Sequence, residues 1–156
     1  MSNSCSACST SRICPEGMTY VKQELTKYPK KAIVACEGAC IKGEVARVAA
    51  NILAYRLQRN SAVRICLGDA STGNSGMLEL IHRAPEVISI EGCPLHCGIN
   101  ILKNRVPDLH ATIIDTSKLY NFDRGKYFEI FDLPREQIEE YALAVAVHIE
   151  NKYFKE

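Results

Sequence analysis

The chain has 156 residues, of which 47% are hydrophobic and 24% are charged, and this size and composition are those of one globular domain. Its 19 basic and 18 acidic residues leave a net charge of +1, which excludes the strong field that attracts nucleic acid or an anionic membrane. We therefore expect neither as a partner. A chain of this length buries enough surface to fold without disulfides or metals, so its eight cysteines need another explanation.

The start of the chain and its apolar runs predict a cytoplasmic protein. Residues 1–18 are mostly polar or small and lack the apolar run of about 7–15 residues that marks a secretory signal. The longest uncharged apolar run, Tyr141–Ile149, is about half of the roughly 18 residues that a membrane span needs. In a reducing cytosol, clustered cysteines are more often metal ligands or catalytic groups than disulfide partners.

The first predicted segment has no sustained periodicity. Residues 1–30 are rich in Ser, Thr, Pro and Gly and carry Cys5, Cys8 and Cys14, so we expect an irregular, cysteine-bearing arm. The α/β domain is expected over residues 31–156.

Strands and helices alternate from there on. Short apolar, β-branched runs predict strands over Ala32–Cys36, Val63–Gly68, Glu86–Gly92 and His110–Asp115. Amphipathic or proline-started segments predict helices over Glu44–Arg59, over Met77–Ala84, from Cys93-Pro94 onward and after Pro134. Residues 69–76 are expected to form a loop, and residues 121–133 either a β excursion or a loop packed on the sheet edge.

This alternation predicts a single-domain, three-layer α/β sandwich with a mostly parallel sheet of about four strands, Rossmann-like or flavodoxin-like. No hairpin dipeptide separates consecutive strands, which favours right-handed crossovers. A strand order of 2-1-3-4 or 3-2-1-4 would bring the first three strands together, and 2-1-3-4 would put Cys36 in the middle.

Three of the four predicted strands end in cysteine. Cys36 closes the first, Cys66 lies near the end of the second and Cys93 follows the third, while Cys40 and Cys97 each come four residues later. Ligands of open parallel sheets bind beyond the carboxyl ends of the strands, which lie about 4.8 Å apart. Thiolates there can share one tetrahedral ion with Zn–S bonds of about 2.3 Å. The pattern predicts a cysteine-thiolate metal site, with Zn²⁺ as the leading ion.

The other cysteines and the histidines leave alternatives open. Cys66 could instead pack as a small apolar side chain, and Cys40 could be a ligand, a spare thiol or a redox partner for Cys36. The arm, with Cys5, Cys8 and Cys14, is either a solvent-exposed tail or a supplier of ligands to a second or shared metal site. His96 is a weaker ligand candidate, and the remaining histidines, His82, His110 and His148, are expected to be structural or on the surface.

Two enzyme-like patterns are poor matches. The run from Cys36 to Lys42 has the length of a cysteine-phosphatase loop, but lysine cannot make the bidentate oxyanion contact of the arginine that such loops carry. The glycine-rich residues 71–76 lack the lysine and the spacing of a P-loop. The sequence therefore does not decide whether the protein is an enzyme.

Three blocks, CEGACIKGEVARVAANILAYRL, RICLGDAS and VISIEGCPLHC, resemble in order and spacing the DGC-domain family of zinc-binding proteins. The likeness runs from about Ala32 to Arg105, and the family motif is Ile-Asp-Gly-Cys-Pro-x-x-Cys. The resemblance implies a zinc site, with the ligands Cys36, Cys66, Cys93 and Cys97. Glu91 replaces the motif's aspartate, and Cys40 stands where members usually have a small residue without a thiol.

Residues and resemblance together predict a zinc-binding protein with a structural, sensing or metal-handling role. The alternative is an iron–sulfur electron-transfer protein or a thiol-redox enzyme that uses Cys36 and Cys40. A protein partner is not predicted.

Overall fold

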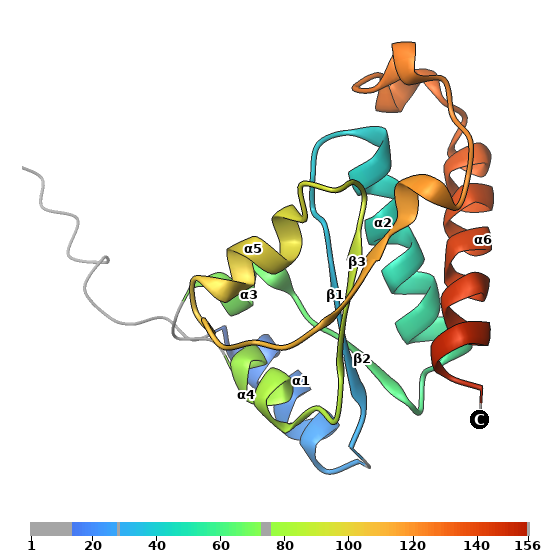
Figure 1. The fold of residues 1–156 in the computed structure, drawn as a ribbon. Helices are drawn as coiled ribbons and strands as arrows, with labels where there is room; N and C mark the ends of the chain where they lie inside the picture. The colour runs from blue at the N-terminus through green and yellow to red at the C-terminus, as the bar shows by residue number, and fades with distance from the viewer. Residues whose placement is uncertain (1–13, 28, 73–75, 156) are drawn as a thin grey trace, which may run out of the picture.

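The fold is taken from a computed structural model that describes residues 14–27, 29–72 and 76–155. Over these residues, four parallel strands form one sheet in the order β2-β1-β3-β4 (Figure 1). The strands are β1 (Lys31–Ala35), β2 (Ala62–Arg64), β3 (Val87–Glu91) and β4 (Thr112–Asp115). The predicted α/β fold with a parallel sheet is confirmed, and the order is one of the two expected.

The register brings the carboxyl ends of three neighbouring strands to one level. Ala35 at the end of β1 pairs with Ile90, and Glu91 at the end of β3 pairs with Asp115 at the end of β4. Nearly all of β1 and β3 is buried, because helices cover both faces of the sheet. Residues that follow these strands therefore emerge together at one edge of the sheet.

Two helices cover one face and four cover the other within the described chain (Figure 1). The first face carries α2 (Ile41–Ile52), which continues as a π-helical turn over Leu53–Leu57, and α6 (Arg135–Tyr153). The second face carries α1 (Pro15–Leu25), α3 (Leu67–Ser71), α4 (Met77–Arg83) and α5 (Cys97–Lys103). The core is accordingly split into two apolar clusters, one on each side of the sheet.

The irregular structure predicted for residues 1–30 is wrong over Pro15–Leu25, which form α1. The Cys14 sulfur accepts a hydrogen bond from the Gly17 N–H at 3.4 Å, Pro15 occupies the first helical turn, and Val21 is buried against the second face. Val21 is the one fully buried residue of this helix, so the apolar periodicity that would have marked it is weak. Residues 1–13, with Cys5 and Cys8, lie outside the described residues.

The helix predicted to start at Cys93-Pro94 starts instead at Cys97. His96 has a left-handed backbone with φ of 52°, and its N–H donates to the Cys93 carbonyl at 3.2 Å, so residues 93–96 form a turn before α5. The loop predicted over residues 69–76 is partly helical, because Leu67–Ser71 form α3; residues 73–75 are not described.

Residues 121–133 form no strand. Short 3₁₀ turns over Arg124–Lys126 and Ile130–Asp132 carry this segment from the sheet edge to the start of α6, and a further 3₁₀ turn follows β4 at Thr116–Lys118. The predicted β excursion is therefore wrong and the loop is correct. None of the helices in the described chain combines the length and apolar character that crossing a bilayer requires.

Candidate functional site

Four cysteines lie at the carboxyl edge of the sheet. Cys36 directly follows β1, Cys93 comes two residues after β3, Cys40 precedes α2, and Cys97 is the first residue of α5. Parallel strands of matched register place all four at the same edge, which is where open α/β sheets bind their ligands.

Cys36 is the most buried of these thiols, at 5% exposure. Its backbone N–H donates to the Ile90 carbonyl at 2.9 Å, which extends the β1–β3 pairing by one residue. Burial raises the pKa of the Cys36 thiol; the backbone N–H groups of Gly38 and Gly92 oppose the rise, and the nearby Glu91 and Cys97 groups add to it.

Cys40 lies on the other side of a tight turn at Gly38. A Cβ placed on Gly38 would be 3.2 Å from the Cys36 sulfur and 3.9 Å from the Cys40 sulfur, so the two thiols flank this glycine. The Cys40 sulfur also caps α2, accepting from the Gly43 N–H at 3.4 Å. Gly43 itself must be glycine, because a Cβ there would lie 2.5 Å from the Gly38 carbonyl oxygen.

Tyr127 lies near Cys40 and Cys93. Interaction with the Cys40 thiol, followed by burial and the charge of that thiol, raises the pKa of Tyr127 to about 12, and Cys93 adds to the rise. The Tyr127 carbonyl accepts from the Ile41 N–H at 3.0 Å, and the Lys42 ammonium lies 5.5 Å from the ring centroids of both Phe122 and Tyr127. The loop over residues 121–133 therefore packs against the carboxyl edge of the sheet, next to these cysteines.

Glu91, the residue at the position of the motif's aspartate, holds the start of α5 in place. It is fully buried, and its carboxylate accepts from the N–H groups of Gly98 at 3.1 Å and Ile99 at 2.7 Å and from the Ser89 hydroxyl at 2.6 Å. These are the free N–H groups of the first turn of α5, so Glu91 fixes the helix that begins with Cys97.

Cys66 follows the neighbouring strand β2 at the same edge of the sheet. It is exposed, precedes α3 and lines a cavity of about 380 Å³ together with Tyr20, Glu37 and Arg64. No hydrogen bond joins it to another thiol of the described chain. Cys14 is likewise exposed, and its thiol donates to the Glu16 carboxylate at 3.4 Å. Of the four ligands implied by resemblance, Cys36, Cys66 and Cys93 each follow a strand of the sheet, and Cys97 begins α5.

The described side chains do not form a complete coordination shell. Among the described residues, no three Cys, His, Asp or Glu side chains form a group that could hold an ion as they stand. The donor set itself suits a thiophilic metal, because soft thiolates select zinc, copper(I) or iron–sulfur clusters. Sequence reasoning missed Tyr127, although the aromatic run around Tyr120, Phe122 and Tyr127 was a signal that something packs there.

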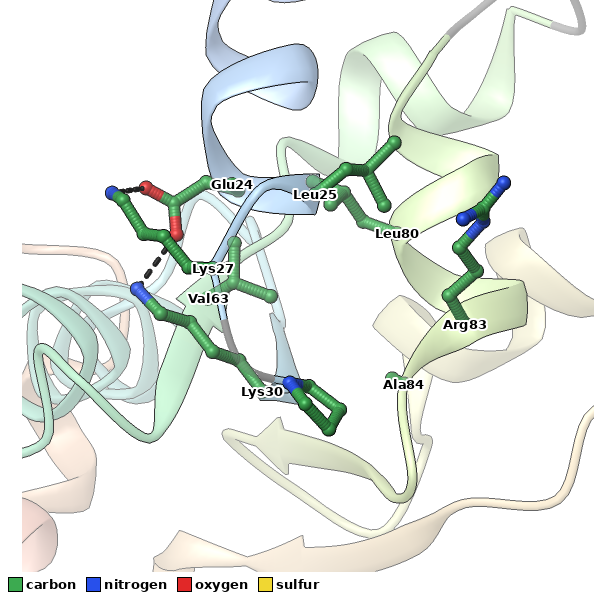
Figure 2. A pocket seen from close by; sticks show the side chains of 9 residues that line it. Glu24, Leu25, Lys27, Lys30, Val63, Leu80, Arg83 and Ala84 are labelled. Atoms are coloured by element: carbon green, nitrogen blue, oxygen red, sulfur yellow. Dashed lines mark hydrogen bonds and ion pairs between the residues drawn. The ribbon is translucent and has the colours of Figure 1, made fainter.

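A further cavity lies at the opposite, amino edge of the sheet (Figure 2). Its volume is about 370 Å³, and it carries no thiol. Figure 2 shows the Glu24 carboxylate between the ammonium groups of Lys27 and Lys30, and the Lys30 contact is 2.6 Å long. Lys30 also donates to the Arg59 carbonyl at 2.8 Å, so this charged cluster joins the end of α1 to the segment before β2.

A parallel α/β domain with cysteines gathered beyond its strand ends is the class of protein that these observations define. Residues 32–145 match the DGC-domain family model, and the chain belongs to this family. No curated protein and no solved structure matches the chain.

Proposed function

We propose that this DGC-domain protein binds one thiophilic metal ion, Zn²⁺, through the thiolates of Cys36, Cys40, Cys93 and Cys97. The observation that carries the proposal is that all four cysteines follow a strand or begin a helix at one edge of the sheet, where Cys36 and Cys40 flank Gly38.

We prefer Cys40 to Cys66 as the fourth ligand because the Cys36 and Cys40 sulfurs both lie close to Gly38. Cys66 lines a cavity together with Glu37 and Arg64. The family resemblance implies Cys66, so the two assignments predict different outcomes when each cysteine is replaced.

Zinc agrees with the chemistry of the donor set. Metal ligation requires thiolate, and thiolates are soft ligands that suit zinc; the Cys40 sulfur lies at the amino end of α2, where it accepts from the Gly43 N–H. When bound, zinc would supply a closed, redox-inactive cross-link between the loops that follow β1 and β3. A closed site of four cysteines has no open coordination position, so a structural, sensing or metal-handling role is favoured over catalysis.

One observation favours a rival function. Because Cys36 and Cys40 flank the same glycine, they could act as a redox-active dithiol, as the sequence alone also allows. An iron–sulfur cluster would use the same cysteines. A cluster would give the protein a colour and bound iron and sulfide, and a redox dithiol would react rapidly with thiol reagents, whereas the zinc proposal predicts none of these.

Metal analysis of anaerobically purified protein tests the proposal. We expect about one zinc per chain, no visible absorbance band and no acid-labile sulfide. Replacing Cys93 by Ser should remove most of the zinc, because three thiolates hold the ion far less tightly than four. Cys14→Ser is the matched control and should keep the wild-type zinc content.

The same preparation separates the alternatives. Loss of zinc in Cys40→Ser but not in Cys66→Ser supports the proposed ligand set, and the reverse result assigns the fourth ligand to Cys66. A coloured protein with iron and sulfide would support the cluster. A folded protein that takes up no metal after reduction and incubation with zinc would refute metal binding altogether.

A further inference from the structure

Arg64 is a buried cation at the carboxyl edge of the sheet, where the cysteines lie. Its side chain is 7% exposed and donates to groups from several elements. Its Nε bonds the Asn51 side-chain oxygen of α2 at 3.1 Å, and its Nη1 bonds the carbonyl of Ile65 and, at 3.5 Å, that of Ile33 in β1. A guanidinium fixed by this many partners is a rigid anchor, because its fork of donors is planar and pre-organised.

The remaining partner of Arg64 is a carboxylate from the cysteine loop. Its Nη2 donates to the Glu37 carboxylate at 2.6 Å, and Glu37 directly follows Cys36. Hydrogen bonds hold the loop over residues 36–40 at both ends: the Cys36 N–H donates to the Ile90 carbonyl, and the Cys40 sulfur accepts from the Gly43 N–H of α2. The ion pair of Glu37 holds the loop between these two ends.

We propose that the Arg64–Glu37 ion pair is a clamp that keeps the Cys36 thiol buried, in the conformation needed to bind metal. The Cys36 N–H continues the β1–β3 pairing and Glu37 follows directly, so a Glu37 carboxylate fixed on Arg64 restricts the backbone that carries the Cys36 thiol. The exposures agree with this arrangement, since the Glu37 side chain is 37% exposed whereas Cys36 is 5% exposed.

Arg64 and Glu37 are thus positioning residues for the metal site and do not ligate the ion. The inference rests on the proposed metal binding for its functional meaning, but the orientation of Cys36 is measurable without metal. A charge-assisted hydrogen bond to a largely buried guanidinium is among the stronger polar contacts in a protein, and the loop has no equivalent contact in its middle.

Alkylation of Cys36 in the metal-free protein tests the clamp directly. Glu37→Gln keeps the side-chain shape and removes the charge, so the rate of Cys36 modification by iodoacetamide, followed by peptide mass spectrometry, should rise about tenfold. Glu37→Asp keeps the carboxylate and should restore much of the protection. The exposed Cys14 is an internal reference whose rate should stay constant.

Zinc transfer to a chelator is the second readout, and it should be faster in Glu37→Gln by a similar factor of about ten. Glu79→Gln, which removes the exposed ion pair with Arg83, is the matched control and should leave both rates unchanged. Wild-type rates of both processes in folded Glu37→Gln would overturn the clamp. If wild-type protein binds no zinc, the metal proposal fails, and the alkylation rates still decide the clamp.

Discussion

At the scale of single residues, Glu91 shows how a carboxylate near a cysteine site can be structural. All three of its described hydrogen bonds go to protein donors, two of them N–H groups in the first turn of α5. Gly98 is required beside it, because a Cβ there would lie 2.9 Å from a Glu91 oxygen and 3.1 Å from the Ala35 carbonyl. The acidic residue of the family motif therefore positions Cys97.

Replacing Glu91 by Ala should destabilise the metal-free protein by about 3 kcal/mol, because buried N–H groups of Gly98 and Ile99 lose their acceptor. Glu91→Gln keeps an acceptor oxygen and should cost about 1 kcal/mol. Urea unfolding measures both. Glu136→Ala, which removes an exposed carboxylate from the first turn of α6, should change stability little. Equal stabilities of Glu91→Ala and Glu91→Gln would contradict this role.

Some residues of the site could be located from the sequence, and others could not. Cys36 and Cys93 could be placed because each follows an uninterrupted apolar strand, and the motif spacing brought Cys97 with them. Tyr127 and the Arg64–Glu37 pair could not be placed, because these contacts join segments far apart in the chain and depend on side-chain directions that no periodicity records.

At the scale of elements, helix starts and cysteines coincide. Cys14, Cys40 and Cys66 each occupy the cap position before a helix, and Cys97 is the first residue of α5. The strands and the long helices α2 and α6 were predictable from strong apolar patterns, except that the strand predicted over Val63–Gly68 ends at Arg64, because α3 begins at Leu67. The short helices α1 and α3 were not, because each buries only one or two residues.

The two helices on the first face are joined by an ion pair that predicts a pH dependence. Glu44 of α2 contacts Arg135 of α6 at 2.6 Å and Arg47 at 2.8 Å. Burial opposes ionisation of this carboxyl, but the hydrogen bonds and charges of Arg135 and Arg47 prevail and hold the pKa of Glu44 below its ordinary value of 4.5. A lowered pKa in the folded state stabilises the fold above the unfolded-state pKa, and this stabilisation is lost as the pH falls through the folded-state pKa.

Glu44→Gln should therefore lower the unfolding free energy of metal-free protein by roughly 1 kcal/mol at about pH 7 and by much less at about pH 3. Urea unfolding at both pH values measures the difference. Glu139→Gln removes the more exposed partner of Arg135 and should have a smaller effect. An effect of Glu44→Gln that is the same at both pH values would show that its charge does not stabilise the fold.

At the scale of the whole molecule, the parallel sheet determines where chemistry can occur. The order β2-β1-β3-β4 puts β1 beside β3, and their matched ends bring Cys36 and Cys93 to one edge of the sheet. The order could be narrowed to two possibilities from the sequence, because only contiguous strands allow their cysteines to meet. The α3 helix could not be predicted, because it starts directly after Cys66 and only three residues after the end of β2.

The most direct test of the central claim is X-ray absorption at the zinc edge of the zinc-loaded protein. Binding by Cys36, Cys40, Cys93 and Cys97 predicts a first shell of four sulfur atoms at about 2.3 Å. The shell should lose one sulfur in Cys40→Ser and keep all four in Cys66→Ser. A wild-type shell dominated by nitrogen or oxygen would contradict the proposed thiolate site.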